Sequence, residues 1–159
     1  KNNIREVLNI GMYGEEYVVG TKFLTPSRTI TEGDVMLFAG MTGDNNPLHT
    51  DADFGNKTQF GSRIAHGMLV SSVAVGLFCR TQKMDGTAVA ALDTKWKYLA
   101  PVLVGDTIHC EMEVGNVKRS TSKPERCVVT MVYRVLNSDG KLCQEGEMST
   151  MLWWSNPLE

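Results

Sequence analysis

One segment of this 159-residue sequence is apolar on nearly every side when it is drawn as a helix. It spans residues 68–78, and only the small residues Ser71, Ser72 and Gly76 interrupt its apolar side chains. A helix without a polar face is buried on most sides, so the rest of the chain must surround it. The segment is shorter than about 20 residues and is followed by Arg80, so we expect a core helix rather than a membrane span.

The apolar period changes to two after residue 86, which indicates β-strands. Apolar and polar residues alternate from 107 to 114, as in a strand with one solvated face. Further strands are predicted at 16–24, 88–99, 127–136 and 142–153, and the last two are joined by a turn at 137–140. The simplest arrangement is an α+β fold in which an antiparallel sheet of about five strands wraps around one long central helix.

A second helix is predicted at residues 31–42. Thr31 is suited to cap its first turn together with Asp34, and Gly43 ends it because glycine readily takes the left-handed conformation. The connection at 43–65 is polar and weakly periodic, apart from a short helical turn expected near 51–57. Irregular connections of this length are usually functional or disordered, and the Phe and Ile residues here argue against disorder.

The composition excludes several classes of protein. Sixteen Lys and Arg against eighteen Asp and Glu give a net charge of -2, which supplies no broad field for holding nucleic acid or an anionic membrane. The four cysteines lie far apart without a C-x-x-C pattern, so we expect reduced structural thiols and no metal site.

No repeat or linker divides the chain, which predicts a single domain over residues 1–159. The absence of a leader pattern favours a cytoplasmic protein, and a segment upstream of Lys1 is left open.

The long connection carries an acid and a titratable base, Asp44 and His49. Between them, Pro47 fixes its own φ angle and pushes Asn46 toward an extended conformation. The stiffened chain would hold the two groups at a constant separation, as a proton-transfer site requires. The alternative is structural, with Asp44 capping the loop and His49 as a hydrogen-bonded polar residue.

Gly67 stands at the start of the apolar helix. The first N–H groups of a helix have no partner inside it and lie at the positive end of its dipole. Because glycine has no side chain, a ligand carbonyl could approach this backbone closely, and the N–H group could stabilise an oxyanion. The alternative is a glycine that serves only packing between loop and helix.

Two separated motifs resemble the MaoC-like dehydratase family, which includes R-specific enoyl-CoA hydratases. They are the stretches at 44–49 (DNNPLH) and 64–68 (IAHGM), and the similarity continues through 100–106 into the C-terminal strands. The resemblance implies a hot-dog fold and a homodimer or higher homo-oligomer. It also implies an acid–base dyad of Asp44 and His49, with the Gly67 N–H as oxyanion donor and no cofactor. Some relatives carry a serine where this chain has Val75, so that polar contact is absent here or is replaced by Ser71 or Ser72.

The reaction implied by this resemblance is the reversible addition of water across the C2=C3 bond of a 2-enoyl-CoA thioester, which gives an R-3-hydroxyacyl-CoA. We predict that His49 activates the water, and that Asp44 orients the water or supplies the proton to C2. His66 either lines the pocket or supports the dyad loop. A metal site built from Asp44, His49 and His66 is disfavoured, because no ligand-spacing motif supports it. The residues predicted to contact the acyl-CoA substrate near the dyad are Asn46, His66, Met68 and Ser71.

A basic cluster at 118–126 includes Arg119 and Lys123. It is either a solvated hairpin tip or a contact for the phosphates of coenzyme A. Two other functions stay open beside hydration: a hot-dog acyl-CoA thioesterase, in which water attacks the thioester carbon, and a non-catalytic acyl-binding domain. The acyl-chain preference does not follow from the sequence.

Overall fold

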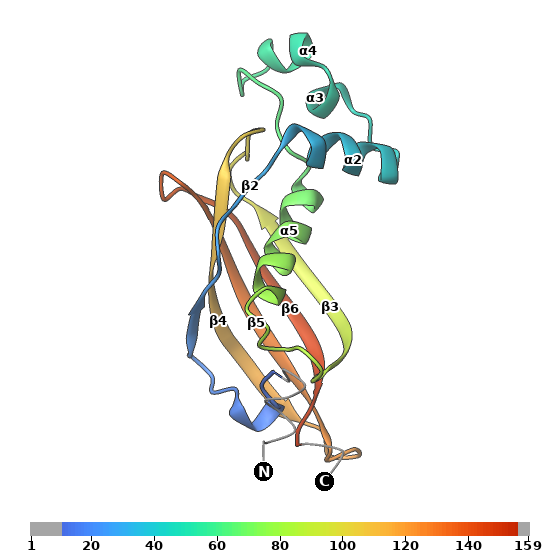
Figure 1. Ribbon diagram of the computed structural model, residues 1–159, viewed down its shortest axis with the longest axis vertical. Helices are drawn as coiled ribbons and strands as arrows, with labels where there is room; N and C mark the ends of the chain where they lie inside the picture. The colour runs from blue at the N-terminus through green and yellow to red at the C-terminus, as the bar shows by residue number, and fades with distance from the viewer. Residues whose placement is uncertain (1–10, 156–159) are drawn as a thin grey trace, which may run out of the picture.

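The computed structural model describes residues 11–155, so the first ten and last four residues of the predicted domain lie outside it. A curved antiparallel sheet wraps around one long helix, α5 (Gly67–Cys79), and three shorter helices gather at one end of the sheet (Figure 1). These are α2 (Glu32–Thr42), α3 (Pro47–Thr50) and α4 (Ala52–Asn56), and a 3-10 turn, η1 (Gly14–Glu16), precedes the first strand. The predicted α+β hot-dog arrangement is confirmed.

The sheet has the strand order β1-β4-β5-β6-β3, and β2 pairs with β4 beside β1. Its strands are β1 (Lys22–Leu24), β2 (Arg28–Thr29), β3 (Ala88–Tyr98), β4 (Thr107–Arg119), β5 (Arg126–Asn137) and β6 (Leu142–Trp153). All neighbouring pairs are antiparallel, and the registers of the four long strands run almost unbroken along their length. The period-two segments therefore form one continuous sheet.

The prediction of a single N-terminal strand at 16–24 is wrong. Gly20 takes a φ of 85° inside a tight turn that the Thr21 N–H closes by donating to the Val18 carbonyl oxygen, so only Lys22–Leu24 joins the sheet there. Pro26, which has no N–H to donate to a ladder, separates β1 from the two-residue β2. The sheet consequently has six strands among the described residues.

Helix α2 begins and ends as its sequence predicts. The Thr31 hydroxyl accepts a hydrogen bond from the Asp34 N–H at 3.2 Å, and the Asp34 carboxylate accepts from the Thr31 N–H at 2.8 Å. These reciprocal bonds satisfy N–H groups that a helix start would leave unpaired. Gly43 ends the helix with a φ of 80°.

Helix α5 packs its buried residues against the concave face of the sheet, and most of the core lies between them. One side of α5 stays exposed in the single chain, at Met68, Ser72, Gly76 and Cys79. Strand β3, at the end of the sheet, is exposed at every residue except Trp96. Among the described residues no helix is long and apolar enough to cross a membrane.

Candidate active site

The connection between α2 and α5 places the predicted acid and base. Asp44 follows the left-handed Gly43, and its carboxylate accepts a long hydrogen bond from the Asn46 N–H at 3.4 Å. Asn46 takes φ -54° and ψ 132°, the extended conformation that a following proline favours, and its side chain caps α3. Pro47 then opens α3, so that His49 lies on its single turn.

His49 and His66 lie side by side. Their ring centroids are 3.8 Å apart and the ring planes differ by 30°. The Nδ1 atom of His49 lies 2.8 Å from the Ile64 carbonyl oxygen, and Nε2 of His66 lies 3.0 Å from that of Asp44. A carbonyl oxygen can only accept, so each of these nitrogens donates. In the neutral rings, Nε2 of His49 and Nδ1 of His66 are therefore left as acceptors.

The Asp44, His49 and His66 side chains converge. Each offers one ligand atom, and these atoms lie within 4.8 Å of one another. His66 is buried, His49 is half-buried and Asp44 is exposed, so the group spans the wall of a hollow. His66 lies beside His49 and donates a hydrogen bond to the Asp44 backbone. It can therefore both line the pocket and support the loop that carries Asp44 and His49.

These three groups are also the described residues that could together hold a metal ion. The absence of a metal at this group stays a prediction.

Gly67 is the first residue of α5, beside this group. A Cβ atom at Gly67 would stand 3.0 Å from two ring carbons of Tyr98, closer than ordinary contact. Glycine at this position avoids displacing the exposed Tyr98 ring, and the helix start is presented without a side chain in front of it. Tyr98 also donates a hydrogen bond from its hydroxyl to the Met68 sulfur at 3.0 Å.

A cavity of about 670 Å³ opens at this end of the molecule. Asp44, His49, His66, Gly67 and Met68 line it, so five of the predicted site residues are brought together. The rest of its wall is mainly apolar and comes from α2, from residue 60, from 64–65 and from the connection at 98–102. Such a pocket, apolar with a few convergent polar groups, is typical of a small-molecule site.

Sequence analysis missed two parts of this wall, the 98–102 connection and Gln144 on β6. Gln144 is 2% exposed and occupies the buried phase of its strand, where apolar residues are expected. A polar residue in that phase was the available signal. Nothing in the sequence places it beside residue 67, which is 77 positions away.

Two other predicted contact residues lie near the cavity but do not line it. Asn46 is exposed, and its side chain accepts from the Leu48 N–H at 3.0 Å. Ser71 is 3% exposed and hydrogen-bonds within the protein, to Gly67 and Gln144. Ser72 is exposed, and Val75 packs against the core. Substrate contact by Asn46 or Ser71 stays a prediction.

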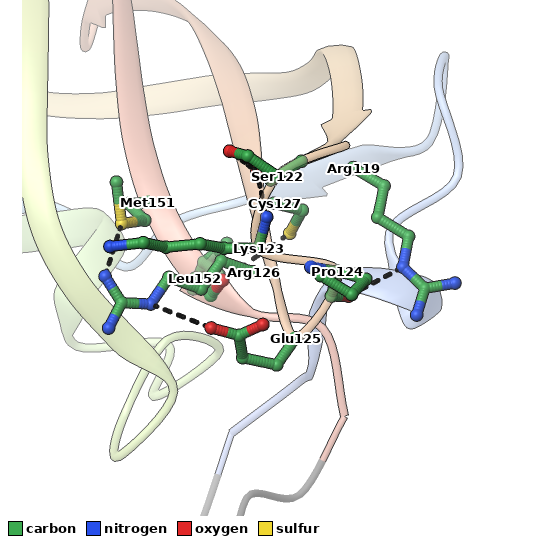
Figure 2. A network of polar contacts seen from close by, with 10 residues as sticks. Arg119, Ser122, Lys123, Pro124, Glu125, Arg126, Cys127, Met151 and Leu152 are labelled. Atoms are coloured by element: carbon green, nitrogen blue, oxygen red, sulfur yellow. Dashed lines mark hydrogen bonds and ion pairs between the residues drawn. The ribbon is translucent and has the colours of Figure 1, made fainter.

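Arg119 is the last residue of β4 and Lys123 lies in the connection to β5, at the opposite end of the sheet from α2, α3 and α4 (Figure 1). Figure 2 shows Arg119 donating from Nε to the Pro124 carbonyl oxygen, at 2.7 Å. Its guanidinium also lies over the Trp154 ring, 4.8 Å from the centroid. The structure does not bring this cluster to the cavity of its own chain, and its assignment to coenzyme A phosphates stays a prediction.

An ion pair that the sequence did not reveal ties the end of the site loop to the start of α2. Arg63 donates through both Nη atoms to the two carboxylate oxygens of Glu32, at the start of α2. The hydrogen bond from Arg63 holds the pKa of Glu32 below its usual value. Arg63 also reaches the His49 carbonyl oxygen at 3.5 Å, so the pair braces the backbone that carries His49.

Comparison with known proteins agrees with this geometry. The family model described as MaoC like domain matches residues 15–135. An (R)-specific enoyl-CoA hydratase of Rhodospirillum rubrum is 32% identical over 126 residues, which are 79% of this chain and 82% of that protein. The unliganded R-hydratase PhaJ1 from Pseudomonas aeruginosa is similar in structure, with a TM-score of 0.75 and 33% identity over 91% of this chain and 88% of the other. A Mycobacterium tuberculosis protein described as a double hotdog fold is 22% identical with a TM-score of 0.82, over 94% of this chain and 46% of its own, and that likeness shows the fold alone.

Proposed function

Because this chain belongs to the MaoC-like domain family, we propose that it is an enoyl-CoA hydratase that converts 2-enoyl-CoA thioesters to R-3-hydroxyacyl-CoA thioesters and catalyses the reverse dehydration. The observation that carries the proposal is the convergence of Asp44 and His49, with His66, within 4.8 Å at the mouth of the cavity. An acid and a base at this separation can both reach one bound water molecule.

We assign the base to His49. Its Nδ1–H is held by the Ile64 carbonyl oxygen, which fixes the ring and leaves Nε2 to accept a proton from water. The hydroxide formed in this step bonds to C3 of the substrate, and the C2=C3 electron pair moves toward the thioester oxygen. Asp44 orients the water, or supplies the proton that C2 then receives. In the former case the proton held by His49 is returned to C2. In the latter case it passes to Asp44 after the addition, so that both groups regain their starting protonation states.

The developing negative charge on the thioester oxygen needs a donor, and we assign that part to the Gly67 N–H. It lies at the amino end of the 13-residue α5, where N–H groups lack helical partners. Donors fixed before the reaction cost no reorganisation in the transition state. The apolar wall around this point would accept the acyl chain and exclude competing water.

We further propose that the protein acts as a homodimer or higher homo-oligomer joined through β3. This strand ends the sheet with one unpaired edge and exposes Val89, Leu92 and Tyr98. Exposed, apolar strand edges invite pairing with another strand. A sedimenting species of 17.6 kDa, the mass of one chain, would contradict this arrangement.

We place the enzyme in the cytoplasm. All four cysteines are unpaired, as expected of a reducing compartment. Recovery of the native protein from a secreted fraction, with its thiols oxidised, would contradict this location.

Incubation with crotonyl-CoA followed by mass analysis separates the candidate functions. We expect a product heavier by one water. Release of free coenzyme A would instead indicate a thioesterase, and an unchanged thioester would indicate a non-catalytic acyl-binding domain.

The most direct test is His49→Ala. This substitution removes the proposed base at a half-buried position and leaves the core closed. We expect kcat to fall by about 100-fold or more, with the unfolding temperature nearly unchanged. His109→Ala, at a half-buried histidine on β4, is the matched control and should keep full activity. Turnover that persists in folded His49→Ala would overturn the assignment.

A further inference from the structure

Helix α5 differs from the helices before it in how its start is held. The side chains of Thr31, Asn46 and Asp51 cap α2, α3 and α4. Helix α5 has no side-chain cap, and its first residue is glycine, the residue with the most backbone freedom. The proposed oxyanion donor therefore sits on the helix start that lacks the usual restraint.

Gln144 on β6 and Ser71 on α5 itself restrain the start of α5. Gln144 Nε2 lies 3.0 Å from the Gly67 carbonyl oxygen, and Gln144 Oε1 lies 2.8 Å from Ser71 Oγ. Ser71 Oγ is itself 3.0 Å from the same Gly67 oxygen. Two polar atoms, one from β6 and one from α5, thus lie within hydrogen-bond distance of one carbonyl oxygen.

Chemistry decides how this cluster is bonded. The Gly67 oxygen can only accept, so the NH₂ group of Gln144 must face it and the amide oxygen must face Ser71. The Ser71 hydroxyl has a single proton, which then serves the Gln144 oxygen. The result is a directed chain, from the Ser71 hydroxyl to the Gln144 oxygen and from the Gln144 amide to Gly67.

Burial makes the hydrogen bonds of Gln144 and Ser71 costly to break. Gln144 and Ser71 are 2% and 3% exposed. An amide buried without partners costs free energy, so this side chain is held firmly in the one orientation that satisfies it. Its fixed position on β6 is transmitted to the peptide group that follows Gly67.

We propose that Gln144 is a positioning residue, which with Ser71 fixes the first turn of α5 so that the Gly67 N–H faces the thioester oxygen. The inference rests on the proposed function. A displaced oxyanion donor weakens transition-state binding more than substrate binding. Loss of Gln144 should therefore lower kcat and leave KM nearly unchanged.

The test is Gln144→Met, which keeps an unbranched side chain of similar length and removes both hydrogen bonds. With crotonyl-CoA we expect kcat to fall about tenfold, less than the about hundredfold that loss of a whole oxyanion donor costs, and KM to stay within about twofold. Thr150→Val is the matched control, since Thr150 is also a buried polar residue of β6 but lies outside the cavity. It should lose no activity. Unchanged kcat in folded Gln144→Met would overturn the proposal.

Ser71→Ala supplies a second test that does not depend on the folding of Gln144→Met. It removes one neutral hydrogen bond, and we expect kcat to fall about threefold. The double variant should be no slower than Gln144→Met, because residues that act as a unit are not additive. Unchanged kcat in Ser71→Ala, or fully multiplicative losses in the double variant, would contradict a shared role.

A third readout separates this inference from the proposed function. If the wild-type protein fails to convert crotonyl-CoA, the proposed function fails, and kcat can no longer be used. The ¹⁵N–¹H resonance of Gly67, recognised by its absence from the spectrum of Gly67→Ala, then carries the test. A shift in Gln144→Met but not in Thr150→Val supports positioning by Gln144, and an unmoved resonance overturns it.

Discussion

Gly146 lies in β6 between two aromatic residues on the neighbouring strands. It pairs with Trp96 of β3 on one side and with Tyr133 of β5 on the other. The two rings approach across it, with centroids 5.3 Å apart. A Cβ atom added at Gly146 would stand 2.6 Å from two Trp96 ring carbons, where ordinary contact begins near 3.4 Å. The indole would therefore have to move by roughly 1 Å.

We expect Gly146→Ala to destabilise the protein by about 2 kcal/mol. Overpacking costs about 1–3 kcal/mol, and separating the aromatic pair costs about 0.5–1.5 kcal/mol. Alanine in place of glycine returns about 0.4–1 kcal/mol by restricting the unfolded chain. For a chain of this length the net loss lowers the unfolding temperature by about 4–8 °C.

Denaturant and thermal unfolding of three variants check this reasoning. Gly40→Ala is the matched control, because Gly40 lies in α2 with no atom within 4 Å of its added Cβ, and it should raise stability by about 0.5–1 kcal/mol. In a Trp96→Val background the Gly146→Ala change should become neutral or favourable. A Gly146→Ala protein as stable as the wild type, or a penalty that persists without the indole, would refute the argument.

Two further predictions concern titratable groups. Burial raises the pKa of Asp34, but hydrogen bonds from Thr31 and the charge of Arg28 together hold it below its usual value. The stability that this carboxylate contributes is complete above its unfolded pKa of about 3.9 and is lost as the pH falls through the lower folded value. The difference in unfolding free energy between wild type and Asp34→Asn should therefore be constant from about pH 5 to 7 and should shrink at lower pH. A difference that grows on acidification would contradict this prediction. Burial raises the pKa of the Cys110 thiol to about 12, and Cys79 is the exposed cysteine, so a thiol reagent at about pH 8 should label at most one cysteine in the native protein, none in Cys79→Ser and four after unfolding. Rapid labelling of several thiols in the native state would show that the core opens.

The periodic segments of the sequence predict most of the fold. The apolar stretch at 68–78 is α5, and the alternating segments from residue 88 onward are β3 to β6 with small shifts at their ends. These predictions succeed because burial of a helix or of one sheet face imposes a period on the sequence. The N-terminal strand is predicted too long because Gly20 interrupts the segment at 16–24, so that only its last three residues join the sheet.

The candidate site contains residues that the sequence could identify and residues that it could not. Asp44, His49 and Gly67 lie within one stretch of the chain and line one cavity. Local stiffness and the position of a helix start marked them as candidates but left structural roles open, and the resemblance to the MaoC-like dehydratase family grouped them. Gln144 comes from a strand far along the sequence, and only the packing of β6 beneath α5 brings its amide to Gly67. Arg119 and Lys123 have side chains suited to phosphate, but the direction of β4 carries them to the other end of the sheet.

Different stretches of the sequence supply the polar and the apolar parts of the cavity wall. The acid–base groups lie between α2 and α5, whereas much of the facing wall comes from the 98–102 connection, which carries no ionisable group except Tyr98. Mutations in this connection can therefore reshape the proposed acyl-chain site while the proposed proton-transfer groups are inherited intact. We expect substrate range to diverge rapidly among close relatives at these positions, and a library randomised there is an economical route to an enzyme with altered selectivity.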